Sequence, residues 1–114
     1  MLFPYAQRLT KFSDWWRQLT AESLGKAKNE KGELVNIGIT PVPALGVTDQ
    51  HSQSQLYNEG PNDKLFIFIE VEDMGAPLHI PPISEAVMEY LGDLPFDLLL
   101  KTEKEGTIMS LIEN

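Results

Sequence analysis

The sequence has no cysteine, and this absence removes several classes of function at once. Without a thiol there is no disulfide scaffold, no thiolate zinc site and no cysteine nucleophile. A chain of 114 residues does not need such cross-links, because a domain of this size can bury a core that is large enough to stabilise it. The absence of cysteine is compatible with a reducing compartment, and the cytoplasm is the predicted location.

Basic residues and long apolar runs are also scarce. Nine Lys and Arg residues stand against 17 Asp and Glu residues, which gives a net charge of −8 that repels nucleic-acid phosphates and anionic lipids. The longest purely apolar run, residues 65–69, is far shorter than the roughly 20 residues needed to cross a bilayer. No basic segment followed by an apolar stretch opens the chain. We therefore expect neither nucleic acid nor a membrane as a partner.

The apolar residues that are present alternate between strand-like and helix-like patterns. "MLFPY" resembles the end of a strand, and apolar residues at helical spacing predict a helix over residues 6–19. "LVNIGI" is typical of a buried strand, and "KLFIFIEVE" predicts the longest strand of the chain. Between them, Thr48 or Asp49 can cap a short helix that ends at Gly60 and Pro61.

The C-terminal third adds two predicted helical stretches, "ISEAVMEYL" and "PFDLLLKTEKEGTIMSLIEN", divided by residues 92–95. Gly106 weakens the second helix without preventing it. Strands and helices that alternate with short connections predict an α/β fold with an open parallel sheet flanked by helices.

Two long segments resemble bacterial glucose-6-phosphate isomerase, also called phosphoglucose isomerase. They are "WWRQLTAESLGK" (residues 15–26) and "TPVPALGVTDQHSQSQLYNEGPNDK" (residues 40–64). The similarity runs from residue 4 to about residue 72 and extends more loosely over "EYLGDLPFDLLL". The resemblance implies a flavodoxin-like sugar-isomerase (SIS) domain. Residues 1–114 are then an incomplete second, C-terminal SIS domain, which lacks the start of its first strand and the C-terminal helix of the family.

The resemblance also implies the chemistry. Family members interconvert glucose 6-phosphate and fructose 6-phosphate through a cis-enediol intermediate, without a cofactor. The glutamate of the family's "ES.GK" segment is the base and falls on Glu22, and the histidine of its "QH" segment assists ring opening and falls on His51. Gln50 is the candidate substrate-binding or supporting residue. A carboxylate enclosed by apolar groups and an imidazole both suit proton transfer near neutral pH.

The expected positions of these two residues favour a homodimer. A helix that follows a parallel strand runs back, so Glu22 should lie near the amino edge of the sheet and His51 beyond its carboxyl edge. Strands rise about 3.3 Å per residue, which places the two residues on the order of 15 Å or more apart. The resemblance implies that His51 serves the site of the neighbouring subunit.

Other interpretations remain open at this point. The family's Ser/Thr phosphate loop and its active-site arginine segment have no counterpart here, so the chain alone is expected to be inactive. The alternative is a stand-alone SIS-like module that binds a sugar phosphate or a protein without catalysis, and a third possibility is an oligomerisation segment. No metal site is expected, because His79 has neither a neighbouring histidine nor a ligand spacing.

Overall fold

The computed structural model describes residues 1–112, and its centre is a short parallel sheet. Strand β1 (Leu2–Pro4) pairs in parallel with β4 (Ile67–Ile69). Residues 42–46 lie along the other edge of β1, where the Leu2 N–H donates to the Val42 carbonyl at 3.0 Å and the Gly46 N–H donates to the Pro4 carbonyl at 3.0 Å. The predicted α/β class with a parallel sheet flanked by helices is therefore confirmed.

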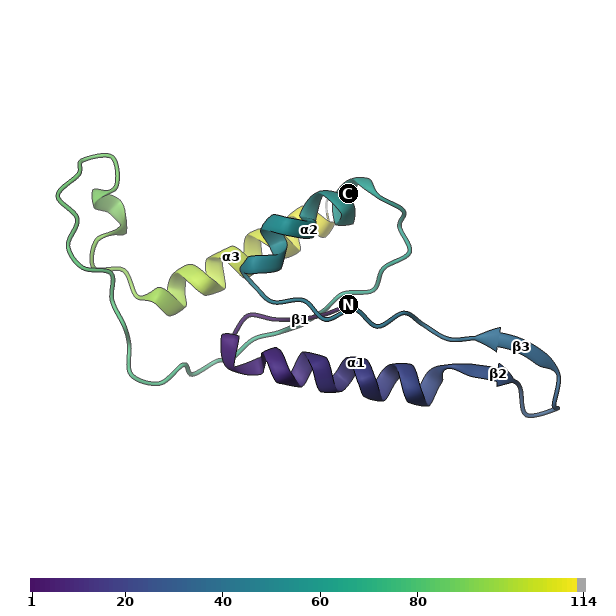
Figure 1. Cartoon of the computed structure of the whole chain (residues 1–114). Coiled ribbons are helices and arrows are strands. Elements are labelled where there is room, and N and C mark those ends of the chain that lie inside the picture. Colours follow the sequence, from purple (N-terminus) through teal and green to yellow (C-terminus); the bar gives the residue numbers. More distant parts are fainter. Residues whose placement is uncertain (113–114) are drawn as a thin grey trace.

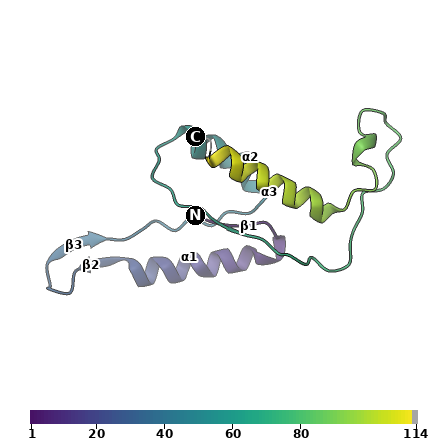
Figure 2. The same cartoon turned by 180° about the vertical axis from the view of Figure 1, so that it is seen from behind.

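Three helices cover the two faces of this sheet (Figures 1 and 2). Helix α1 (Thr10–Leu24) follows a 3₁₀ turn, η1 (Gln7–Leu9), and lies on one side of β1. Helices α2 (Thr48–Glu59) and α3 (Phe96–Ile112) lie on the other side. Each strand-to-strand connection therefore returns through a helix, as parallel pairing requires.

The two helices on the shared face agree with the sequence in most respects. α2 ends before Gly60 as predicted, but its N-cap is Val47, whereas Thr48 or Asp49 is the cap that the sequence predicts. The Asp49 carboxylate instead accepts the N–H of Leu45 at 2.6 Å. α3 continues through Gly106 as predicted, and the end of its predicted range, residues 113 and 114, lies outside the described residues.

The prediction that "LVNIGI" forms a buried strand is wrong. Strand β3 (Leu34–Ile37) is exposed and pairs with β2 (Lys26–Lys28) in an antiparallel hairpin beyond the end of α1. The tip of the hairpin has strong local turn chemistry. Gly32 adopts a positive φ of 82°, and the Asn29 side chain accepts the N–H groups of Lys31 and Glu33. Residues 42–46 take the place in the parallel sheet that the sequence assigns to this strand.

Two further elements are shorter than predicted. β4 has only three residues, because β1 offers it only three partners. "ISEAVMEYL" forms turns and a single 3₁₀ turn, η2 (Glu89–Leu91), in place of a helix. A short helix needs a packed face to be stable, and Val87 and Tyr90 of this segment are 86% and 73% exposed.

The core is small and lies between the sheet and the helices α2 and α3. Phe3, Tyr5, Ala44 and Tyr57 are its buried residues, and the Phe3 and Phe68 rings stack 5.4 Å apart. The radius of gyration is 18.6 Å, whereas a compact domain of this length has about 13 Å. The β2–β3 hairpin and the segment around η2 project from opposite ends of the molecule (Figure 1). Much apolar surface is consequently uncovered.

Candidate functional site

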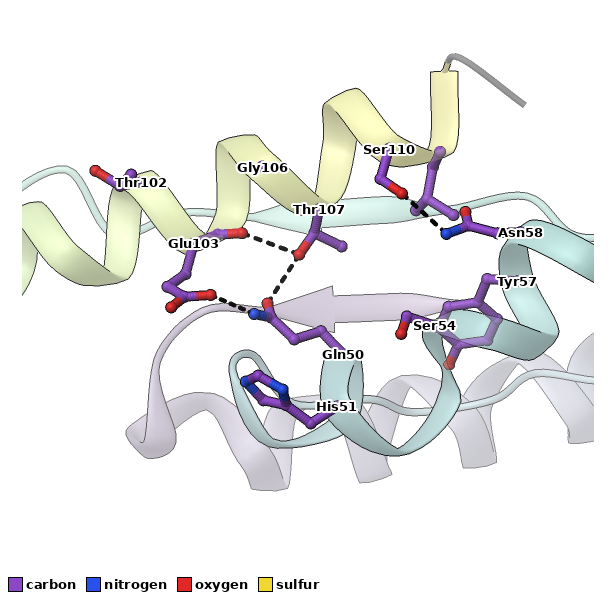
Figure 3. Close-up of a pocket in the computed structure, with 11 residues that line it drawn as sticks. Gln50, His51, Ser54, Tyr57, Asn58, Thr102, Glu103, Gly106, Thr107 and Ser110 are labelled. Atoms are coloured by element: carbon purple, nitrogen blue, oxygen red, sulfur yellow. Dashed lines mark hydrogen bonds between the residues drawn. The ribbon is translucent and has the colours of Figure 1, made fainter.

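His51 lies in the first turn of α2 and lines a groove of about 410 Å³ between α2 and α3 (Figure 3). Polar side chains line most of the groove, which contains hydroxyl, amide and carboxylate groups from both helices. The His51 side chain is exposed, and no hydrogen bond holds its imidazole among residues 1–112. The position of this imidazole is therefore set mainly by the backbone that carries it.

Gln50, the neighbour of His51, is buried and connects three elements. Its amide oxygen accepts the hydroxyl of Tyr5 at 2.6 Å and lies 2.8 Å from the hydroxyl of Thr107. Its amide nitrogen donates to the Glu103 carboxylate at 2.5 Å. Gln50 thus links the end of β1 and the middle of α3 to the first turn of α2, and we call these four residues the Gln50 network. Because both ends of the amide are engaged, the network fixes the backbone beside His51.

The tyrosines on this face of the sheet are held in their neutral form. Burial raises the pKa of Tyr5, and the nearby Glu103 carboxylate raises it further. Burial and the charge of Asp49 together raise the pKa of Tyr57 to about 12. At Gly46, an added Cβ would lie 2.5 Å from ring atoms of Tyr5, so only glycine allows this ring to approach so closely.

The sequence analysis missed Glu103 and Thr107. Their i, i+4 spacing on the predicted C-terminal helix places them on one face, and this spacing is a signal that could have found the pair. Which partner they meet depends on how α2 and α3 pack together, and that is a tertiary feature.

Glu22 lies in the last turn of α1, far along the chain from the Gln50 network. Its carboxylate is exposed, and the Gln18 amide nitrogen donates to it at 3.1 Å. Within residues 1–112 no apolar enclosure surrounds this carboxylate, and Trp15 of the same helix is itself 54% exposed. Gln18 was also missed by the sequence analysis, although it stands four residues before Glu22 on the same helix.

The structure does not bring Glu22 and His51 together. The C-terminal end of α1 and the N-terminal end of α2 lie toward opposite ends of β1 (Figures 1 and 2). The groove beside His51 is lined only by residues of α2 and α3. Within one chain, the carboxylate and the imidazole therefore face different surroundings.

No group of three or more His, Cys, Asp or Glu side chains within residues 1–112 could hold a metal ion. His79 contacts the Asp93 carbonyl through Nδ1 at 2.8 Å. None of the helices in the described part of the chain is both long enough and apolar enough to span a bilayer.

Comparison with solved structures shows that this α/β fold also occurs in a longer protein. The chain superposes with a TM-score of 0.88 and 40% identity on part of the crystal structure of a hypothetical protein from Thermus thermophilus. The match covers 98% of this chain and 26% of that one. The open α/β arrangement therefore also occurs as a segment within a chain about four times as long.

Comparison of sequences identifies the relatives. The glucose-6-phosphate isomerase of Carboxydothermus hydrogenoformans is 48% identical over 99% of this chain, and one from Thermus thermophilus is 42% identical over 96%. A probable glucose-6-phosphate isomerase of Haloquadratum walsbyi is 41% identical over 99%. No protein-family model matches the chain. The predicted resemblance to glucose-6-phosphate isomerases is confirmed, and the chain spans about a quarter of the length of these relatives.

Proposed function

We propose that this chain contributes catalytic residues to a glucose-6-phosphate isomerase and does not isomerise the sugar phosphate by itself. The observation that carries the proposal is the 48% identity over 99% of the chain to 25% of an isomerase. Assignment of the segment to the second SIS domain and a cytoplasmic location belong to the same proposal.

Glu22 is the base in this proposal. Its carboxylate takes the proton from C2 of the open-chain aldose while the C1 carbonyl oxygen gains a proton, which gives the cis-enediol. The proton then returns to C1 while the hydroxyl on C2 loses its own proton, and the ketose is formed. The exposed carboxylate, which accepts a hydrogen bond from Gln18, is accessible for this step, and in this proposal further polypeptide of the complete isomerase encloses it.

His51 opens the sugar ring in this proposal, by giving a proton to the ring oxygen. An imidazole can donate and accept protons near pH 7, which suits this role. Gln50 supports His51 through the Gln50 network and does not bind substrate through a free amide, because both of its ends are already bonded. Sequence reasoning left both roles open for Gln50, and the contacts favour the supporting one.

We further propose that each complete site takes Glu22 from one chain and His51 from a second copy. Support comes from the arrangement of α1 and α2, whose relevant ends lie toward opposite ends of β1. A sugar phosphate is too small to reach both ends of the sheet. A twofold dimer would place the His51 end of one chain beside the Glu22 end of the other.

A chimera tests the catalytic roles. This chain replaces the matching quarter of the Carboxydothermus hydrogenoformans enzyme, and isomerisation of fructose 6-phosphate is followed in a coupled assay. We expect an active chimera, no turnover by the 114-residue chain alone, and a loss of kcat of roughly 10²–10⁴-fold for Glu22→Gln and for His51→Gln. His79→Gln is the matched control, with unchanged kcat. Full turnover by both Glu22 and His51 variants, or turnover by the chain alone, would contradict the proposal.

A further inference from the structure

Helix α1 buries polar side chains and exposes apolar ones, which is the reverse of the usual amphipathic helix. Its buried residues are Ser13 and Thr20, which are small and polar and lie on the side that packs against β1. Three of its large apolar residues are exposed: Phe12 is 41%, Trp15 54% and Leu19 48% exposed. Successive helical residues are rotated by about 100°, so these three residues lie on one side, rotated by roughly 100° from the buried pair.

These three residues form a continuous patch, which we call the α1 stripe. The Phe12 and Trp15 rings lie 5.4 Å apart, and Leu19 stands one turn beyond Trp15. Next to the stripe, Trp16 lines a separate groove of about 560 Å³ together with Ile39, Val42, Leu65 and other residues. A patch of aromatic and aliphatic side chains of this kind marks an interaction surface.

We propose that the α1 stripe is the docking surface for the remaining polypeptide of a glucose-6-phosphate isomerase. The inference rests on the proposed function. Two observations favour this occupant. The same open conformation occurs in a crystal structure as 26% of a longer chain, at a TM-score of 0.88. The similar isomerases are about four times as long as this chain, so they contain enough further polypeptide to cover the stripe.

A second copy of this chain is the alternative occupant, and the test below distinguishes it from the rest of an isomerase. The radius of gyration of 18.6 Å shows an open chain, and the cluster of buried core residues lies on the α2–α3 side of the sheet. A covering partner on the α1 side would complete a core between helix and polypeptide, with the stripe at its centre.

The test compares one substitution in two contexts. Trp15→Glu places a charge in the middle of the stripe, and Gln7→Glu adds the same charge at an exposed position in η1. In the 114-residue chain, both variants should unfold at nearly the same temperature as the parent. In the chimera with the Carboxydothermus hydrogenoformans enzyme, Trp15→Glu should lower Tm by roughly 5 °C or more, because a buried unpaired charge is strongly destabilising, and Gln7→Glu should not.

Several outcomes would overturn the inference. The first is a chimera whose Tm is unaffected by Trp15→Glu. The second is a discrete dimer of the 114-residue chain in sedimentation equilibrium that Trp15→Glu abolishes, since the occupant would then be a second copy. The third is an insoluble chimera from a soluble chain, since the other three quarters would then not accept this surface. None of these readouts involves turnover, so a chimera in which Glu22→Gln keeps full activity would defeat the proposed function alone.

Discussion

The two faces of the sheet differ in how they are covered. On the α2–α3 face, aromatic rings and the Gln50 network are buried together, and the Lys104 ammonium pairs with the Glu70 carboxylate, whose pKa it lowers. On the α1 face, the helix contributes two small polar residues to the contact and leaves Phe12 and Trp15 exposed. The α2–α3 face is therefore well packed, whereas apolar side chains of α1 remain uncovered. The helix with these uncovered side chains is also the one that carries Glu22.

The largest contrast between the two faces should appear in a pair of phenylalanines. Phe3 is fully buried in the core, and Phe12 is 41% exposed on the α1 stripe. We expect Phe3→Ala to lower the free energy of unfolding of the chain by about 3–5 kcal/mol, and Phe12→Ala to lower it by less than about 1 kcal/mol. Urea denaturation monitored by circular dichroism measures both. Equal losses of stability would show that Phe12 is packed as tightly as Phe3.

Alkaline pH should weaken only the α2–α3 face. The pKa of Tyr57 is 10.0 when unperturbed and about 12 in the folded chain, so the folded state holds this proton more tightly. Its contribution is fully present below pH 10 and is lost as the pH rises toward 12, by up to about 3 kcal/mol. The free energy of unfolding should therefore fall between about pH 10 and about pH 12. In Tyr57→Phe the fall should be clearly smaller, and an identical fall would remove Tyr57 as the cause.

The hydroxyl of Thr107 should matter through the Gln50 network. Thr107→Val keeps the shape of the side chain and removes the hydroxyl that lies near both Tyr5 and Gln50, so we expect a loss of about 1–2 kcal/mol in the free energy of unfolding. Thr107→Ser is the matched control and should retain most of the stability. In the chimera, Thr107→Val should lower kcat more than Thr107→Ser does, measured at a temperature where both are folded. A loss of stability with unchanged kcat would make the network structural only.

The sequence predicts those parts of the fold that local patterns control. The helix after β1, the polar helix from Thr48 to Glu59 and the long C-terminal helix are all present, because the spacing of residues that favours a helix acts within a few residues. "LVNIGI" is the instructive failure. Its composition is that of a buried strand, but the Asn29–Gly32 turn folds it back onto residues 26–28 before it can reach the sheet.

The candidate site was predictable as residue types but not as geometry. The resemblance to isomerases singles out Glu22, His51 and Gln50 by residue type. The polar face of α2 looks unsuited to a core until Tyr5, Glu103 and Thr107 are seen to engage Gln50, and these partners lie 45, 53 and 57 residues away along the chain. Such contacts depend on how helices pack, which composition and periodicity do not specify.

Mixing two inactive chimeras tests the central claim most directly. One carries Glu22→Gln and the other His51→Gln, and the subunits are exchanged by dilution and concentration. If each site combines Glu22 of one subunit with His51 of the other, half of the dimers are hybrids with one intact site, and activity should recover to about a quarter of the parent value. If one chain supplied both residues to its own site, every subunit would carry a defect and the mixture would stay inactive. That result would contradict the account.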